Sequence, residues 1–366
     1  MRYLSKLDLK KFAHKTCFLR IDLNVDGGEE RDSLRLEAII PTVKLFLKNK
    51  IRVLILSHRG RPNSKDKNLS LRPFAAILSQ KIGEKVIFLP DFKATKNLKK
   101  PTKNKVFLFE NLRFWSGEAQ NDPKFVRKLA ILGDFYVNEA FPASHRENAS
   151  ISAITRFLPV YLGLRFEEEI KNLSGFLKVQ RKPLTVILGG AKVEDKAGVI
   201  RYFWQKADYF LLGGGPANTF FALEGLPVGD SLIDKKAKSP IPNHLKANNK
   251  ILLPIDTKIK NREILDIGNR TVREYAKIIK KSKTIIWAGP MGYYQKKGFE
   301  NGTKGIWRAI LANRKARIAV GGGETVASIK LLGIRELAFR NKNIFLSTGG
   351  GAMLEFLSGK KLTGIN

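Results

Sequence analysis

The 366-residue sequence has one cysteine, three methionines and four histidines, and its 33 acidic residues are outnumbered by 67 basic ones. The single cysteine, Cys17, excludes an intramolecular disulfide and any metal cluster built on several thiolates. It lies in an apolar segment, residues 16–20, which favours a buried strand thiol over a reactive nucleophile.

Long hydrophobic runs are also missing. No apolar stretch reaches the roughly 18 residues that a membrane-spanning helix requires. Residues 1–12 lack the apolar core and the small-residue cleavage site of a signal peptide. We therefore expect a soluble, cytoplasmic protein with no membrane partner, and its length allows two or three domains.

The shortage of acidic residues gives a formal net charge of +34 at pH 7. A field of this sign attracts polyanions, including phosphates and nucleic acid. The basic residues are dispersed along the chain and do not form one terminal arm. We interpret them mainly as a solvated surface, so nucleic-acid binding is an alternative and not the principal hypothesis.

The first half of the chain repeats one pattern, in which an apolar segment is followed directly by polar residues. Strands are predicted over residues 18–21, 53–56, 106–109 and 135–137, and a helix over residues 36–47, where apolar residues recur every three or four positions. This alternation predicts a parallel sheet. Polar groups that follow its strands should meet at the carboxyl edge, where such sheets bind ligands.

The residues expected at this edge are mostly arginines and histidines. They are Arg35, His58, Arg61, Arg113, His145 and Arg146, together with Asp22 and Asn24. Guanidinium groups match carboxylate and phosphate oxygens bidentately, and Asp22 with Asn24 offers partners for a hydroxyl. Taken singly, each arginine or histidine has a structural interpretation. Their convergence from four strand ends favours a site for a small, multiply charged anion.

The second half ends its predicted strands in glycine. After residues 186–188 come Gly189-Gly190 and the expected start of a helix, on which Lys192 and Lys196 would share one face. Free N–H groups and two ammonium groups there suit a polyphosphate, and the alternative is an ordinary turn with two solvated lysines. Between the halves, residues 164–177 predict one amphipathic helix that serves as connector and hinge. The P-loop pattern is absent, and no complete dinucleotide fingerprint follows a first strand.

The two halves carry a series of motifs, which are, in chain order, RIDLNVD, SHRGRP, FENLRF, YVNEAFPASHR, ILGGAKVEDK, GGGPANTF, LPID, WAGPMG, GGGET and STGGGA. This ordered set resembles the motifs of phosphoglycerate kinase. The resemblance covers nearly the whole sequence. It implies an α/β fold with two doubly wound parallel-sheet, Rossmann-like domains joined by a hinge helix. The implied domains are residues 1–165, which bind phosphoglycerate, and residues 166–351, which bind nucleotide and include the connector. Residues 352–366 are expected to pack back on the first domain.

The resemblance implies a monomeric glycolytic kinase that transfers a phosphoryl group reversibly between 1,3-bisphosphoglycerate with ADP and 3-phosphoglycerate with ATP, by hinge closure. The implied substrate-binding residues are Asp22, Leu23, Asn24, Arg35, His58, Arg59, Gly60, Arg61, Arg113, His145 and Arg146. The implied catalytic residues are Arg35, Lys192 and Gly350. The implied nucleotide-binding residues are Lys192, Lys196, Gln295, Gly322, Gly323, Glu324 and Thr325, and Glu324 would reach the metal through nucleotide-bound Mg²⁺.

Three departures from the family pattern fall on the nucleotide side. Glu324 stands where the family usually has an aspartate, Gln295 where it has a glutamate, and Ala288 where an asparagine is common. Two other hypotheses stay open from sequence. One is a polyanion-binding protein on a retained kinase fold, and the other is a kinase for a different small phosphorylated acid.

Overall fold

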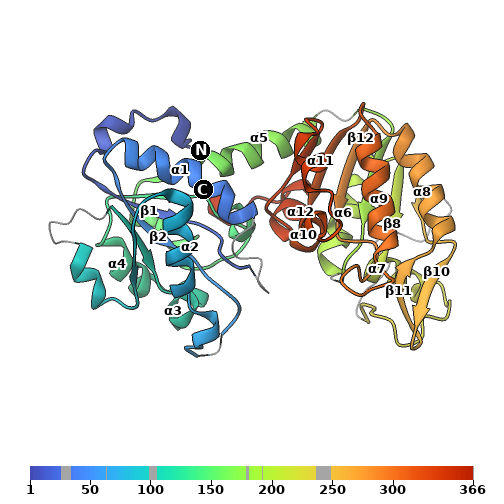
Figure 1. Cartoon of the computed structure of the whole chain (residues 1–366), viewed down its shortest axis with the longest axis horizontal. Helices are drawn as coiled ribbons and strands as arrows, with labels where there is room; N and C mark the ends of the chain where they lie inside the picture. The colour runs from blue at the N-terminus through green and yellow to red at the C-terminus, as the bar shows by residue number, and fades with distance from the viewer. Residues whose placement is uncertain are drawn as a thin grey trace. The chain divides into compact units, whose positions relative to one another are not determined.

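The structure is a computed structural model of the whole chain, described here for residues 1–25, 34–62, 64–98, 105–178, 181–191, 193–235 and 249–365. The chain forms two compact units. Unit 1 comprises Met1–Ile170 and Lys361–Asn366, and unit 2 comprises Lys171–Lys360. The chain therefore passes between the units twice, once within helix α5 (Leu164–Lys178; Figure 1) and once after Lys360.

The division differs in detail from the boundaries expected from sequence. It falls between residues 170 and 171 of α5, and not between residues 165 and 166. The segment that returns to unit 1 is shorter than the expected residues 352–366. Residues 352–360 belong to unit 2, because helix α12 (Gly351–Leu357) packs against helix α6 (Glu194–Phe203) of the same unit.

Unit 1 is built on a parallel sheet with the strand order β3-β4-β2-β1-β5-β6. Its strands are β1 (Thr16–Arg20), β2 (Arg52–Leu56), β3 (Val86–Leu89), β4 (Val106–Phe109), β5 (Phe135–Asn138) and β6 (Val160–Leu162). Cys17 lies inside β1 and is fully buried, as its apolar neighbours predict. Strand order reverses on the two sides of β1, so its carboxyl end lies beside the switch point where such sheets bind ligands.

Both faces of this sheet are covered by apolar side chains. Helix α1 places Leu36, Ile39 and Val43 on one buried face, at the spacing that a helix requires. The opposite sheet face carries a second core that includes Phe18 and Tyr136. The helices of this unit are α1 (Leu34–Lys48), α2 (Arg72–Ile82), α3 (Ser116–Ala119) and α4 (Pro123–Ala130), and α5 begins in it.

Unit 2 has a second parallel sheet with the order β14-β13-β12-β7-β8-β9 and a separate antiparallel hairpin, β10-β11. The strands are β7 (Leu184–Leu188), β8 (Tyr209–Leu212), β9 (Ile251–Leu252), β10 (Thr257–Lys260), β11 (Glu263–Ile267), β12 (Thr284–Ala288), β13 (Arg317–Gly321) and β14 (Ile344–Leu346). The order reverses between β7 and β12, which is the arrangement of a doubly wound, dinucleotide-type sheet. The predicted fold class is confirmed.

The remaining helices of unit 2 are α7 (Gly214–Leu223), α8 (Asn269–Lys281), α9 (Asn301–Ala312), α10 (Gly323–Leu331) and α11 (Arg335–Arg340). Trp287 of β12 packs edge-on against Trp307 of α9, with ring centroids 4.7 Å apart. Helix α6 begins at Glu194, and Lys192 lies outside the described residues, so the expectation that Lys192 and Lys196 share one helix face stays a prediction. Within the described ranges, no helix is long and apolar enough to cross a membrane.

Candidate active site

The loops that follow β1 and β2 in unit 1 are joined by hydrogen bonds. The Ser57 hydroxyl donates to the Ile21 carbonyl and accepts from the Leu23 amide, each at 2.9 Å. The Gly60 amide donates to Asn24 Oδ1 at 2.7 Å. These bonds hold Asp22, Leu23 and Asn24 in a fixed position at the carboxyl edge, close to the switch point of the sheet.

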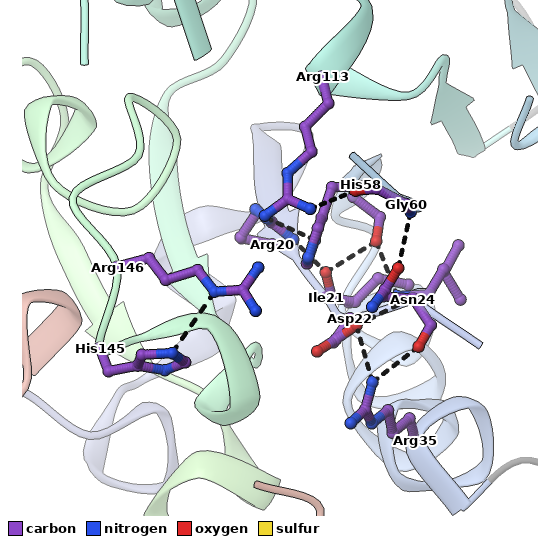
Figure 2. Close-up of polar contacts among 12 residues, drawn as sticks. Arg20, Ile21, Asp22, Asn24, Arg35, His58, Gly60, Arg113, His145 and Arg146 are labelled. Carbon is purple, nitrogen blue, oxygen red and sulfur yellow. Dashed lines mark hydrogen bonds and ion pairs between the residues drawn. The ribbon is translucent and has the colours of Figure 1, made fainter. Parts of the chain in front are cut away.

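Arg35 lies in the first turn of α1 and reaches this loop. Its Nη1 donates to the Asn24 carbonyl at 2.8 Å and lies 3.4 Å from Asp22 Oδ1. The Arg35 side chain is 21% exposed and that of Asp22 is 6% exposed. The guanidinium is therefore oriented by two fixed oxygens while it stays accessible to a ligand (Figure 2).

Arg113 and Arg146 approach the same region from two other segments (Figure 2). Arg113 donates to the Gly60 carbonyl, and Arg146 Nε lies 3.4 Å from His145 Nε2. Burial, with the nearby charges of Arg146 and Arg20, lowers the pKa of Arg113 to about 10. Burial also lowers the pKa of Arg146, although Asp22 opposes the shift. Crowded cations of this kind are stabilised when an anion binds between them.

His58 is buried beneath these arginines, and burial together with the charge of Arg20 holds its pKa well below the usual value. It is therefore neutral at pH 7. Its Nδ1 lies 3.0 Å from Arg20 Nη2. A guanidinium only donates hydrogen bonds, so Nδ1 accepts and the ring proton resides on Nε2. His58 is consequently a neutral N–H donor at a site that is otherwise strongly positive.

Arg20 is a member of this cluster that sequence reasoning missed. It ends β1, is fully buried, and donates through Nε to Ser150 Oγ at 2.8 Å and through Nη1 to the Ile21 carbonyl. Ser150 in turn is held by the buried carboxylate of Glu118. An arginine that ends an apolar strand was the available signal, because a buried charge requires partners.

The other expected residues of unit 1 occupy different positions around the cluster. The Arg59 backbone amide donates to Asn111 Oδ1, and its carbonyl accepts from Asn111 Nδ2. The Arg59 guanidinium lies over the Phe74 ring at 5.4 Å from the centroid. Arg61 is exposed, and its charge contributes to lowering the pKa of both Arg113 and Arg146. Gly60 has a φ of 62°, which favours glycine in the turn that presents Arg61.

In unit 2, the loops after β7 and β12 meet at the switch point through their backbones. The Gly190 amide donates to the Pro290 carbonyl at 2.7 Å. A Cβ on Gly289 would lie 2.0 Å from the Gly189 carbonyl oxygen, and Gly289 has a φ of 95°. A Cβ on Gly214 would lie 3.0 Å from the Gly190 amide nitrogen. This close approach of backbones explains why the strands of this unit end in glycine.

The expected phosphate loop lies at the same edge. Gly322 caps α10, and Thr325 in the first turn of this helix accepts a hydrogen bond from the Gly289 amide at 2.8 Å. A Cβ on Gly350 would lie 3.3 Å from the Gly322 Cα, so the loops after β13 and β14 are in contact. Backbone amides at the N-terminus of α10 thus lie next to the switch point, where they favour anions.

The other residues expected to bind nucleotide differ in their exposure to solvent. Glu324 is exposed, and its Oε2 lies 3.7 Å from the position of a Cβ on Gly190. Lys196 is 7% exposed on α6, whereas Gln295 is exposed between β12 and α9. Lys192 lies outside the described residues. In the described ranges, no group of three His, Cys, Asp or Glu side chains is placed to hold a metal ion.

Comparison with known proteins identifies the family. A family model described as phosphoglycerate kinase matches residues 7–360. The chain belongs to the phosphoglycerate kinase family. The phosphoglycerate kinase of Moorella thermoacetica (strain ATCC 39073 / JCM 9320) is 37% identical over 395 residues, which cover 99% of this chain and 98% of that protein. The phosphoglycerate kinase of Wolbachia sp. subsp. Drosophila simulans (strain wRi) is 36% identical over 382 residues, covering 96% and 95%.

Solved structures agree with this family. The phosphoglycerate kinase from Pyrococcus horikoshii OT3 superposes with a TM-score of 0.84 at 28% identity, covering 100% of this chain and 98% of that one. The one from Coxiella burnetii has a TM-score of 0.77 at 31% identity, with 99% and 97% covered. This phosphoglycerate kinase family member is therefore a nucleotide-dependent kinase of glycolytic phosphoryl transfer that acts on small molecules, as the sequence motifs predict.

Proposed function

We propose that the arginine cluster of unit 1 binds 3-phosphoglycerate and 1,3-bisphosphoglycerate, and that the glycine loops of unit 2 bind ATP and ADP with Mg²⁺. The observation that supports the first assignment is the convergence of Arg35, Arg113 and Arg146 on one region above neutral His58. These groups come from separate segments, and hydrogen bonds to the backbone orient two of them.

The cluster matches the functional groups of the proposed substrate. A carboxylate and a phosphate each accept paired N–H donors from guanidinium groups, and Arg113 and Arg146 supply such donors. The neutral His58 ring can donate a hydrogen bond from Nε2–H to a substrate oxygen without adding positive charge to the cluster. Asp22, which is held by the Asn24 amide at 2.8 Å and by Arg35, is a suitable acceptor for a substrate hydroxyl.

The glycine loops suit a nucleotide because their amides approach a ligand without side chains in between. The N-terminus of α10, with Gly322, Gly323 and Thr325, is the part of this edge best suited to phosphates. Glu324 is the carboxylate beside it, and with one carboxylate the metal would be held mainly by the nucleotide phosphates. Bound Mg²⁺ supplies charge neutralisation on those phosphates. Lys196 and Gln295 are proposed as nucleotide contacts from their sequence positions.

Phosphoryl transfer requires in-line placement and neutralisation of charge on the transferred group, with little acid–base chemistry. Arg35 is proposed for this role because Asp22 and the Asn24 carbonyl already fix its orientation. Lys192 is proposed as the second cation, and Gly350 as a backbone donor, from their positions in the family motifs. Hinge closure would bring the two substrates together and exclude water.

The test is phosphoryl transfer from Mg-ATP to 3-phosphoglycerate, followed through a coupled dehydrogenase, for wild type and Arg113→Ala. Loss of one substrate cation should raise KM for 3-phosphoglycerate by about tenfold or more and leave KM for ATP within about twofold. Arg127→Ala, a surface arginine over Phe157 in the same unit, is the matched control. An equal rise in both KM values would contradict the assignment of the acid to unit 1.

A further inference from the structure

Glu139 lies directly after β5 and is hydrogen-bonded to the start of α5. Its Oε2 accepts from the Phe166 amide at 3.0 Å, and its Oε1 accepts from the Arg165 amide at 3.3 Å. It is 3% exposed, and a Cβ on Gly163 would lie 2.2 Å from its carboxyl carbon. The carboxylate therefore fits closely against the first turn of the helix that continues into unit 2.

The neighbouring residue, Asn138, is bound to the other passage between the units. Its Nδ2 donates to the Gly364 carbonyl at 3.1 Å and to Ser144 Oγ at 3.2 Å. The Gly364 amide donates in turn to the Ser144 carbonyl at 2.9 Å. Gly364 belongs to the terminal segment that returns from unit 2 to unit 1. Two consecutive residues thus hold both ends at which unit 1 is joined to unit 2.

Glu139 is also linked to the segments that carry the arginine cluster. The chain runs from Glu139 through a short helical turn, Phe141–Ala143, to His145 and Arg146. On the other side, the hydroxyl of Thr42 donates to Glu139 Oε1, and Thr42 lies on α1, the helix that carries Arg35. A displacement of α5 therefore reaches α1 through the hydrogen bonds of Glu139, and reaches Arg146 through the short chain segment that follows Glu139.

We propose that Asn138 and Glu139 are positioning residues that couple the arginine cluster of unit 1 to both connections with unit 2. The inference rests on the proposed function of that cluster. When 3-phosphoglycerate draws Arg35 and Arg146 toward itself, the shift is transmitted through Glu139 to α5 and through Asn138 to the terminal segment. If Asn138 and Glu139 had only a structural role, they would stabilise unit 1 but would not change the response of α5 to bound 3-phosphoglycerate.

The decisive variant is Glu139→Gln, which keeps the size of the side chain. Both oxygens of Glu139 accept hydrogen bonds, so the NH2 group of glutamine would face a donor and break at least one of these bonds. We expect kcat to fall by roughly tenfold, while KM for 3-phosphoglycerate stays within about twofold, because coupling is lost and the cations remain. Val126→Ala, a fully buried core change in α4, is the matched control for lost stability and should leave kcat within about twofold.

Hydrogen–deuterium exchange separates coupling from stability. In wild type, 3-phosphoglycerate should slow amide exchange in α5 and in residues 361–366. Glu139→Gln should lose the effect in α5, and Asn138→Asp, which removes the donor to Gly364, should lose it in the terminal segment. Binding of 3-phosphoglycerate, measured by calorimetry, provides the check that each variant is folded and competent.

The outcomes distinguish this inference from the function on which it rests. Wild-type protein that neither binds nor phosphorylates 3-phosphoglycerate would overturn the proposed function. Active wild type, together with a Glu139→Gln variant of unchanged kcat and an unchanged exchange response in α5, would overturn the coupling alone. A kcat loss of equal size in Val126→Ala would also overturn it, because general destabilisation would then explain the effect.

Discussion

The two units differ in how they build the sites that we propose for their anionic ligands. In unit 1, long side chains from separate segments meet around His58, and loop hydrogen bonds such as that from Gly60 to Asn24 fix their bases. In unit 2, the proposed nucleotide edge is mostly backbone, where the Gly190 amide donates to the Pro290 carbonyl and the Gly289 amide donates to the Thr325 hydroxyl. One site is built by adding charged groups, and the other by leaving side chains out.

This difference suits the chemistry of the two ligands that we propose. A small acid with a carboxylate, a hydroxyl and a phosphate has several distinct groups, and paired guanidinium donors can recognise their directions. A chain of phosphates presents repeated oxygens, which amides at a helix N-terminus accommodate. The units should therefore differ in the substitutions they tolerate. Unit 1 should be sensitive to loss of a cation, and unit 2 to gain of a methyl group.

The largest effect is expected for Arg35→Ala. Removal of one preoriented hydrogen-bond donor that stabilises charge in the transition state typically lowers kcat by roughly 10²–10³-fold. Steady-state kinetics should show this loss with a much smaller change in KM for either substrate, because the interaction peaks in the transition state. An increase in KM at unchanged kcat would assign Arg35 to ground-state binding.

The next largest effect is expected when a glycine of unit 2 gains a methyl group. Gly289 and Gly298 both have positive φ, 95° and 93°, but a Cβ would meet the Gly189 carbonyl at 2.0 Å in the first case and nothing within 4 Å in the second. Gly298→Ala should cost only the backbone strain, about 1–2 kcal/mol. Gly289→Ala should cost more and weaken Mg-ADP binding by about tenfold or more, as measured by calorimetry. Equal losses in the two variants would show that close backbone approach is not what the switch point requires.

A third effect, on the pH dependence of stability, concerns one buried carboxyl group in each unit. Burial raises the pKa of Glu139 to about 7 and that of Asp266 to about 7, from 4.5 and 3.8. The native state therefore holds both protons more tightly than the unfolded chain. Their contribution to the free energy of unfolding is greatest below the unfolded pKa values and is lost as pH rises to about 7, by about 3 kcal/mol for Glu139 and about 4 kcal/mol for Asp266.

Scanning calorimetry at pH 5 and pH 8 tests this effect. Glu139→Gln and Asp266→Asn should each reduce the fall in apparent Tm between the two pH values, because neither variant has the titrating group. A variant with the same pH dependence as wild type would mean that the replaced carboxyl keeps an ordinary pKa in the folded protein.

Much of the fold was predictable because its signals are local. Residues 106–109 were predicted as a strand with the bounds that β4 has, since they form a short apolar run between polar residues. The hairpin β10-β11 was not predicted. Its strands are half exposed and charged, and its turn uses Asn261 and Arg262 at positive φ in place of the more recognisable Asn-Gly.

The candidate site was predictable where residues follow strands directly, as Asp22 and His58 do. It was not predictable where tertiary contacts decide the role. Nothing near Arg20 in sequence indicates Ser150 or His58, which the fold brings to it across the sheet. Glu139 is similar, because its donors come from Thr42 and from the start of α5. Such partners are distant in sequence, and periodicity carries no information about them.

Hydrogen–deuterium exchange with each ligand alone tests most directly the claim that side chains in unit 1 and backbone in unit 2 bind different substrates. With 3-phosphoglycerate, we expect slower exchange in residues 21–24, 57–61 and 111–113. With Mg-ADP, we expect it in residues 189–191, 213–215 and 322–325. Protection of the glycine loops by 3-phosphoglycerate, or of the arginine cluster by Mg-ADP, would contradict the account.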